Sequence, residues 1–210
     1  MSGGCRAQRD WGRDPVTHSS QYVTHMSDTG TYEDFRRFHR HPGRFRQAAA
    51  PEYFNGGVPV VSFPFYIDDV DPEARYLHWE FVDPDSIPVC GFEWIHWSVA
   101  NLPIDALMYD FNDSHALAIP PDFSRQLPAM IPETVQGCNS SASKFLGRST
   151  DPAVIMRYNG PQPPDKDHEY YLQVWATKKP LPGLNQASGS TSCCTRCATA
   201  VKCPTPTASS

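Results

Sequence analysis

The sequence lacks several features that define large classes of proteins. It contains no run of 18 apolar residues, so no transmembrane helix is expected. Its first residues carry no apolar signal core, which predicts a cytoplasmic protein. The net charge is −5, and this acidic balance argues against a nucleic-acid partner. A Gly-x-Ser-x-Gly motif is also missing, so a nucleophile elbow is not indicated.

The composition that is present favours an all-β domain. A chain of 210 residues with 40% hydrophobic residues can form one domain of ordinary size with tails. The middle section shows no long amphipathic helix, and its 21 prolines include many at strand edges or in loops. We therefore predict an antiparallel β-sandwich of two sheets with a few short helices. The strand-like runs are residues 58–67, 76–82, 92–101, 154–158 and 169–177, and the one helical turn is 140–146.

Two clusters of Gly, Pro, acidic, His and aromatic residues concentrate the chemistry. In the first, DPDSIPVCGFEWIHW, the proline after Asp83 favours extended backbone, and a stiff turn carries Asp83 and Asp85. Trp94 and His96 follow in a strand-like run, where period-two alternation puts them on one face. The second cluster, RYNGPQPPDKDHEYY, contains a Gly160-Pro161 loop. Its strand begins near His168 and Tyr170, which also share a face.

These motifs, in this order, resemble the phosphatidylethanolamine-binding protein family, in its bacterial Raf-kinase-inhibitor-like (YbhB/YbcL-type) branch. The resemblance covers about residues 58–184 and implies a fold of two antiparallel sheets. It also implies a surface pocket for phosphate, phosphorylated head groups or acetate-like anions. The family usually has Arg between the His and the Tyr, where this chain has Glu169. The matching ligand-binding positions are Asp83, Asp85, Trp94, His96, Gly160, Pro161, His168 and Tyr170.

The implied pocket has a simple physical chemistry. Two imidazoles and a phenol can donate hydrogen bonds to phosphate oxygens, and a carboxylate can orient one imidazole. If both histidines titrate near pH ~6.5, affinity for an anion should rise as the pH falls from about 8 to 6. Each residue also has a structural interpretation: His96 as a hydrogen-bonded core histidine, and Asp83 as the cap of a turn.

Two classes of function compete. The first is a binding protein for a small anionic or phosphorylated ligand, acting as an inhibitor or modulator of a kinase or protease. The second is a small hydrolase that uses Asp83 and His96. A pocket of Asp, His and Tyr without a nucleophile or metal favours binding. We expect no cofactor and no metal. The sequence does not decide whether the protein forms a homodimer.

The two ends differ from the middle, which defines a predicted domain at residues 48–186. Residues 1–47 are rich in Arg and His without apolar periodicity, and residues 187–210 are rich in Ser, Thr and Cys. Both are predicted to pack poorly. Three interpretations of the tail compete: a zinc site of Cys193, Cys194, Cys197 and Cys203, a natural disordered tail, and translation out of frame. We favour frameshifts, because shifted frames can encode Pro-Asp-x-x-Gly-Lys before residue 48 and a Gly-Phe-x-x-Asn-Glu helix after residue 186.

Overall fold

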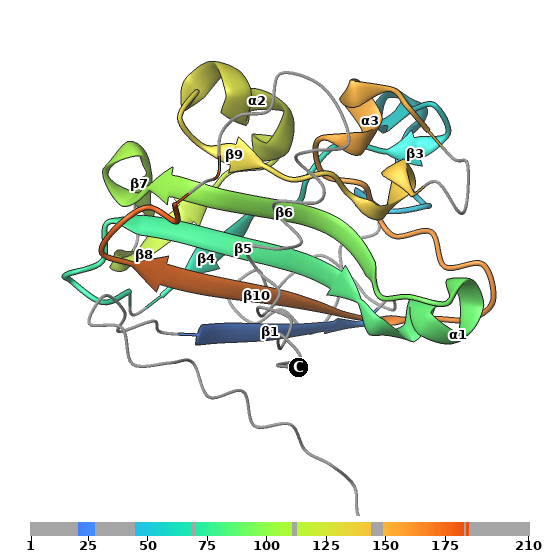
Figure 1. Cartoon of the computed structure of the whole chain (residues 1–210), viewed down its shortest axis with the longest axis horizontal. Coiled ribbons are helices and arrows are strands. Elements are labelled where there is room, and N and C mark those ends of the chain that lie inside the picture. Colours follow the sequence, from blue (N-terminus) through green and yellow to red (C-terminus); the bar gives the residue numbers. More distant parts are fainter. Residues whose placement is uncertain are drawn as a thin grey trace, which may run out of the picture.

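The computed structural model describes residues 45–68, 70–110, 113–143, 149–182 and 184, together with a backbone strand at 21–27. Within these residues the predicted all-β class is confirmed (Figure 1). The helices are short: α1 (Ile87–Cys90), α2 (Phe123–Met130) and α3 (Pro152–Ile155), with 3-10 turns at Pro51–Tyr53, Pro84–Ser86, Ile104–Ala106 and Ser140–Ala142. None of the helices described is long and apolar enough to cross a membrane.

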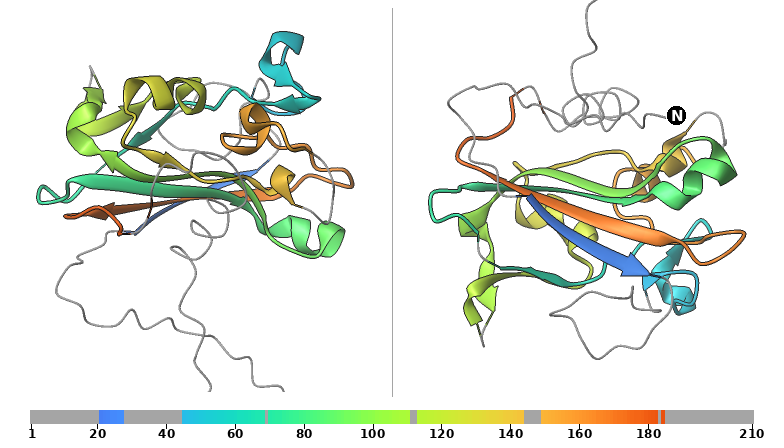
Figure 2. Two further views of the ribbon diagram at one scale, coloured as in Figure 1. Left: turned by 45° about the horizontal axis from the view of Figure 1, so that its top comes forward. Right: turned by 90° about the horizontal axis from the view of Figure 1, so that it is seen from below.

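Two antiparallel sheets form the layers of the sandwich (Figure 2). The larger sheet has five strands in the order β1-β10-β5-β6-β9: β1 (Gln21–Ser27), β10 (Glu169–Thr177), β5 (Tyr76–Asp83), β6 (Trp94–Pro103) and β9 (Val135–Gln136). The smaller sheet has the order β4-β8-β7: β4 (Phe65–Ile67), β8 (Asp113–Ile119) and β7 (Met108–Asp110). A separate two-stranded ribbon pairs β2 (Phe54–Asn55) with β3 (Val58–Pro59).

The core between the layers is aromatic. Phe65 of the smaller sheet meets Trp79 and Trp97 of the larger sheet edge to face, with ring centroids 5.5 and 6.3 Å apart. Trp79 and Trp97 also contact each other at 5.1 Å, and both are fully buried. Such pairs add about 0.5–1.5 kcal/mol each beyond the area they bury. This packing holds the central strands of the larger sheet in place.

Two of the predicted strands are wrong or incomplete. Residues 154–158 do not form a strand. They overlap α3, which begins because the carboxylate of Asp151 accepts a hydrogen bond from the Ala153 N–H (2.8 Å) and Pro152 occupies the first turn. Residues 58–67 form only the short strands β3 and β4, and Pro64, just before β4, has no N–H to donate to a ladder. Strand β8 and helix α2 were not predicted.

The N-terminal segment differs from its expectation where the structure describes it. Strand β1 pairs antiparallel with β10 over seven residues at the edge of the larger sheet. Phe45 is 2% exposed within the core, and the Gln47 N–H donates to the Pro161 carbonyl (3.0 Å). The prediction that residues 1–47 pack poorly is therefore wrong for these parts. The remaining residues of that segment, and residues 187–210 with their cysteines, lie outside the described residues.

Candidate ligand-binding site

The candidate site lies at one end of the larger sheet, where β5 ends and β6 and β10 begin (Figure 1). Because the strands are antiparallel, the last residue of β5 lies beside the first residues of its two neighbours. Asp83 pairs with Trp94 across the β5–β6 ladder. Residues that are far apart in the sequence, at positions 83, 94 and 168, therefore meet at this end of the sheet.

The turn after β5 holds Asp83 in a defined position. Its carboxylate accepts a hydrogen bond from the Ser86 N–H (3.1 Å), which caps the 3-10 turn that Pro84 begins. The Ser86 hydroxyl lies 2.6 Å from the Asp83 carbonyl oxygen and accepts a hydrogen bond from the Trp94 N–H (2.8 Å). Gly91 ends α1 with φ of +88°, a conformation that glycine adopts without strain. The turn is thus a rigid support that fixes one carboxylate oxygen of Asp83, and the other oxygen is left for His168.

A β-bulge at His96 aims the aromatic side chains of β6. Phe81 pairs with Trp97 and Val82 with Ile95, so His96 is an extra residue in the ladder. Simple alternation would put Trp94 and Trp97 on opposite faces, but the extra residue brings both to the core side. The His96 ring lies 5.3 Å from the Phe81 ring. These side chains therefore lie on the core side of the sheet and not on its outer face.

His168 is held between two carboxylates. Its Nδ1 lies 2.7 Å from Asp83 Oδ2, and its Nε2 lies 2.9 Å from Asp165 Oδ1. Burial disfavours the charged ring, but the hydrogen bonds to Asp83 and Asp165 outweigh it and raise the pKa of His168. Burial raises the pKa of Asp83, although the bond from His168 opposes that shift. With both carboxylates ionised, each can only accept, so both ring nitrogens of His168 donate, and the raised pKa of His168 favours this imidazolium form.

His96 has the opposite character. Its Nδ1 lies 2.6 Å from the Asn159 carbonyl oxygen, which can only accept, so Nδ1 carries the hydrogen. Complete burial is the main cause that lowers the pKa of His96 to about 3, so the ring is neutral near pH 7. Its Nε2 therefore presents a lone pair. Within the described part of the chain this buried atom has no hydrogen-bond partner.

These two environments correct the expected pH response. Both histidines were expected to titrate between about pH 8 and 6 and to donate to the same anion. His96 stays neutral through that range, and its Nε2 accepts instead of donating. His168 is charged, but both of its nitrogens already bond to carboxylates. A ligand must therefore supply a donor to His96, or displace Asp165 from His168.

The structure brings five of the eight predicted site residues together. Asp83 bonds to His168, and the Tyr170 ring lies 6.4 Å from His168 and 5.4 Å from His96, which is 6.3 Å from Trp94. The sixth, Asp85, accepts a hydrogen bond from the backbone N–H of Glu169 (3.0 Å) and so joins the turn after β5 to the start of β10.

Gly160 and Pro161 connect the segment that contacts His96 to neighbouring backbone segments. The Gly160 N–H donates to the Pro59 carbonyl (2.8 Å), and the preceding Asn159 N–H donates to the His96 carbonyl (2.9 Å). The contacts of Gly160 and Pro161 in the structure are thus to backbone of neighbouring segments. Two residues that the sequence did not single out, Asn159 and Asp165, set the hydrogen bonding of the two histidines. Only the position of Asp165, three residues before His168, gave a signal for either.

Comparison with known proteins identifies the family. The family model for phosphatidylethanolamine-binding protein matches residues 40–195. The chain belongs to the phosphatidylethanolamine-binding protein family. It is also similar to YxkA of Bacillus subtilis (strain 168), an uncharacterized protein, with 41% identity over 133 residues. That alignment spans 63% of this chain and 71% of the relative.

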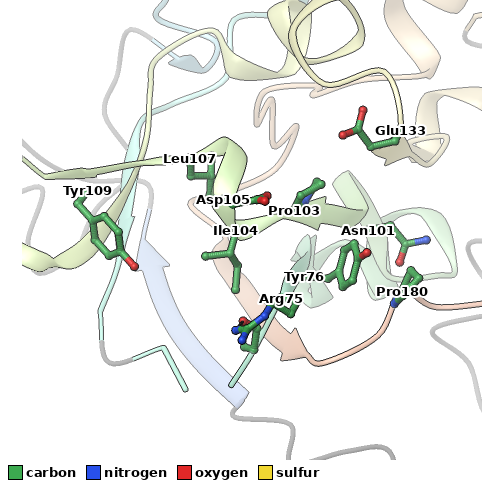
Figure 3. A pocket seen from close by; sticks show the side chains of 11 residues that line it. Arg75, Tyr76, Asn101, Pro103, Ile104, Asp105, Leu107, Tyr109, Glu133 and Pro180 are labelled. Carbon is green, nitrogen blue, oxygen red and sulfur yellow. Dashed lines mark hydrogen bonds between the residues drawn. The ribbon is translucent and has the colours of Figure 1, made fainter. Parts of the chain in front are cut away.

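This member of the phosphatidylethanolamine-binding protein family has a cavity at the other end of the larger sheet (Figure 3). It has a volume of about 870 Å³ and is lined by residues that include Tyr76, Asn101 and Pro180. Strand β5 runs from this cavity to the candidate site, a path of about 25 Å at roughly 3.3 Å per residue. The cavity is therefore distinct from the site that the family motifs form.

Proposed function

We propose that this protein binds a small anionic or phosphorylated ligand at the site of Asp83, His96 and His168, and acts by binding and not by turnover. The observation that carries the proposal is the pairing of opposite roles in two buried histidines. His168 can give a charged N–H to an anion once the exposed Asp165 leaves it, and His96 presents an unpaired acceptor nitrogen. A buried acceptor without a partner costs about 1–3 kcal/mol, and a ligand donor would recover that cost.

The combination selects for an anion that still carries a proton. Inorganic phosphate near pH 7, and the monoanion that a phosphomonoester forms below its second pKa of about 6, have both anionic oxygens and an O–H group. The O–H can donate to His96 Nε2 while the charged oxygens remain attracted to His168. Sulfate has the anionic oxygens alone. The proposed ligand class is therefore a phosphate or phosphomonoester group.

The details of the site favour binding over hydrolysis. A hydrolase that uses Asp83 and His96 would need the two to cooperate, but Asp83 bonds to His168 and His96 bonds to Asn159. The hydroxyl of Ser86 is occupied by three backbone groups, so it is not poised as a nucleophile. A panel of ester, phosphate-ester and peptide substrates, with Asp83→Ala as the control, tests this. Turnover that Asp83→Ala abolishes would support the hydrolase.

Modulation of a kinase or protease is the proposed biological role. Family membership supports a binding protein, and the surface beside the site offers an apolar contact. Ile87 and Val89 of α1, next to the Asp83 turn, are 51% and 42% exposed. A phosphorylated segment of a target protein would place its phosphate in the site and apolar side chains on α1. A cytoplasmic location and a homodimer remain predictions from the sequence.

Phosphate is expected to bind about tenfold more tightly than sulfate at pH 7, because it supplies a hydrogen bond to His96 that is worth about 1–3 kcal/mol. Isothermal titration calorimetry with sodium phosphate and sodium sulfate at equal ionic strength measures the ratio. In His96→Asn, the Asn amide can replace the Nδ1 donor to Asn159 but offers no acceptor at the Nε2 position, so the ratio should approach one. Equal affinity of the parent for both anions would contradict the proposed ligand class.

A further inference from the structure

The outward nitrogen of His168 is covered by a single carboxylate. The His168 side chain is 1% exposed, and one nitrogen is bonded to Asp83, which is itself buried. The other nitrogen bonds to Asp165, whose side chain is 45% exposed. Asp165 therefore stands between the imidazolium and solvent. It belongs to the loop from Pro161 to His168, which carries two further prolines and a second exposed acid, Asp167.

A carboxylate oxygen on an imidazolium N–H occupies the place that an oxygen of an anionic ligand would take. Both are charged acceptors, and an N–H of His168 can serve only one of them well. Partial desolvation would raise the pKa of Asp165, but its hydrogen bonds from His168 and the backbone lower it overall. Asp165 is thus ionised near pH 7 and is a full competitor.

We propose that Asp165 is a built-in competitor that sets the affinity of this site for anions, and that a ligand binds by displacing it from His168. The inference rests on the proposed function and adds the residue that regulates it. Displacement is structurally simple, because Asp165 is exposed and lies in a loop, whereas Asp83 is buried and is held by the hydrogen bond with which it caps the turn. Asp83 therefore keeps His168 oriented and charged while Asp165 leaves.

The competition has a quantitative signature. If the loop must first release His168, the apparent dissociation constant is the intrinsic one divided by the fraction of molecules in the released state. Removing the competitor should then strengthen binding of every small anion by a similar factor. A substitution that changes only the general charge of the loop should have a smaller effect, which falls with added salt.

Asp165→Asn is the test variant, and Asp167→Asn is its control because it removes the same charge two residues away. Calorimetry with inorganic phosphate at pH 7 and fixed ionic strength should show binding about two- to fivefold tighter in Asp165→Asn than in the parent, the range that an exposed carboxylate–cation contact provides. Asp167→Asn should stay within about twofold of the parent at 0.15 M salt, because the Asp167 carboxylate is exposed, and solvent and salt weaken its interaction with the site.

A second measurement tests the contact without any ligand. Histidine-ring NMR should show a lower pKa for His168 in Asp165→Asn, because one of its two charged acceptors is gone, and little change in Asp167→Asn. Phosphate binding that is unchanged or weaker in Asp165→Asn, while the parent binds phosphate, would overturn the competitor and leave the proposed function standing. Phosphate binding to none of the three proteins would overturn the proposed function, and the competitor with it.

Discussion

Acidification from pH 7 to pH 5 is expected to weaken the fold through two buried histidines, His78 and His96. The His78 Nδ1 accepts a hydrogen bond from the Asn101 N–H (3.0 Å), and its Nε2 bonds to the Thr177 hydroxyl (2.9 Å). Burial lowers the pKa of His78 to about 4 and is the main cause that lowers the pKa of His96 to about 3. Protonation of either ring would place a charge in the buried interior and would therefore destabilise the folded state.

The sign and size of the effect follow from linkage. A histidine whose pKa is lower in the folded state stabilises the fold fully above its unfolded pKa of about 6.5, and this contribution is lost as the pH falls toward the folded value. Between pH 7 and 5 the loss is about 2 kcal/mol for each histidine, because the unfolded chain takes up a proton that the folded chain refuses. Together this is a large share of a typical free energy of unfolding, about 5–15 kcal/mol.

His168 acts in the opposite direction. Its pKa is raised in the folded state, so its contribution is present below pH ~6.5 and is lost as the pH rises through the folded value. The raised pKa of Asp83 likewise favours the fold at low pH. The effect of each buried histidine must therefore be measured as a difference between the parent and a variant that keeps all other groups.

His78→Asn and His96→Asn are suitable variants, because Asn can replace the hydrogen bond that each Nδ1 makes. Urea unfolding followed by tryptophan fluorescence reports the fold through the buried Trp79 and Trp97. Each variant should lose about 2 kcal/mol less than the parent between pH 7 and 5, and the double variant about 4 kcal/mol less. Identical losses in parent and variants would show that these rings are protonated at no cost in the fold.

The parts of the fold that the sequence predicted are those with a local periodic signal. The runs at residues 76–82, 92–101 and 169–177 correspond to β5, β6 and β10, where alternation and β-branched or aromatic residues are strong. The two motifs lie at the end of the first run and at the starts of the other two. Because the three strands are antiparallel neighbours, these positions meet at one end of the sheet. Periodicity together with family resemblance was therefore enough to predict that Asp83, His96 and His168 lie near one another.

The remainder depended on contacts between distant segments. The bulge at His96 follows from pairing with β5 and leaves no trace in the alternation of β6. The tautomer of His96 depends on a backbone carbonyl, that of Asn159, which any residue type would provide. The hydrogen bond between His168 Nε2 and Asp165 depends on the path of the Pro-rich loop that carries Asp165. Residue types thus predicted which groups meet, and the tertiary contacts decided which of them donate.

Gly160→Ala is expected to destabilise the protein by about 2–3 kcal/mol, the cost of forcing an extra methyl group into a packed interior. A Cβ at this position would overlap the carbonyl oxygen of Phe45 and would lie 2.8 Å from the Pro59 Cβ. Neither neighbour can move freely. Phe45 O accepts a hydrogen bond from the Tyr158 hydroxyl (2.8 Å), and Pro59 O accepts one from Gly160 itself (2.8 Å).

The same substitution should also weaken phosphate binding. Relief of the overlap must shift the backbone at Asn159, whose carbonyl sets the orientation and tautomer of His96. Gly91→Ala is the matched control: its added Cβ meets nothing within 4 Å, but its φ of +88° strains any residue other than glycine. That variant should cost only about 1 kcal/mol, the usual penalty for the left-handed region. Urea unfolding and phosphate calorimetry on both variants decide the matter. If Gly160→Ala is no less stable than Gly91→Ala and binds phosphate as the parent does, the close packing behind His96 has no role in holding the site.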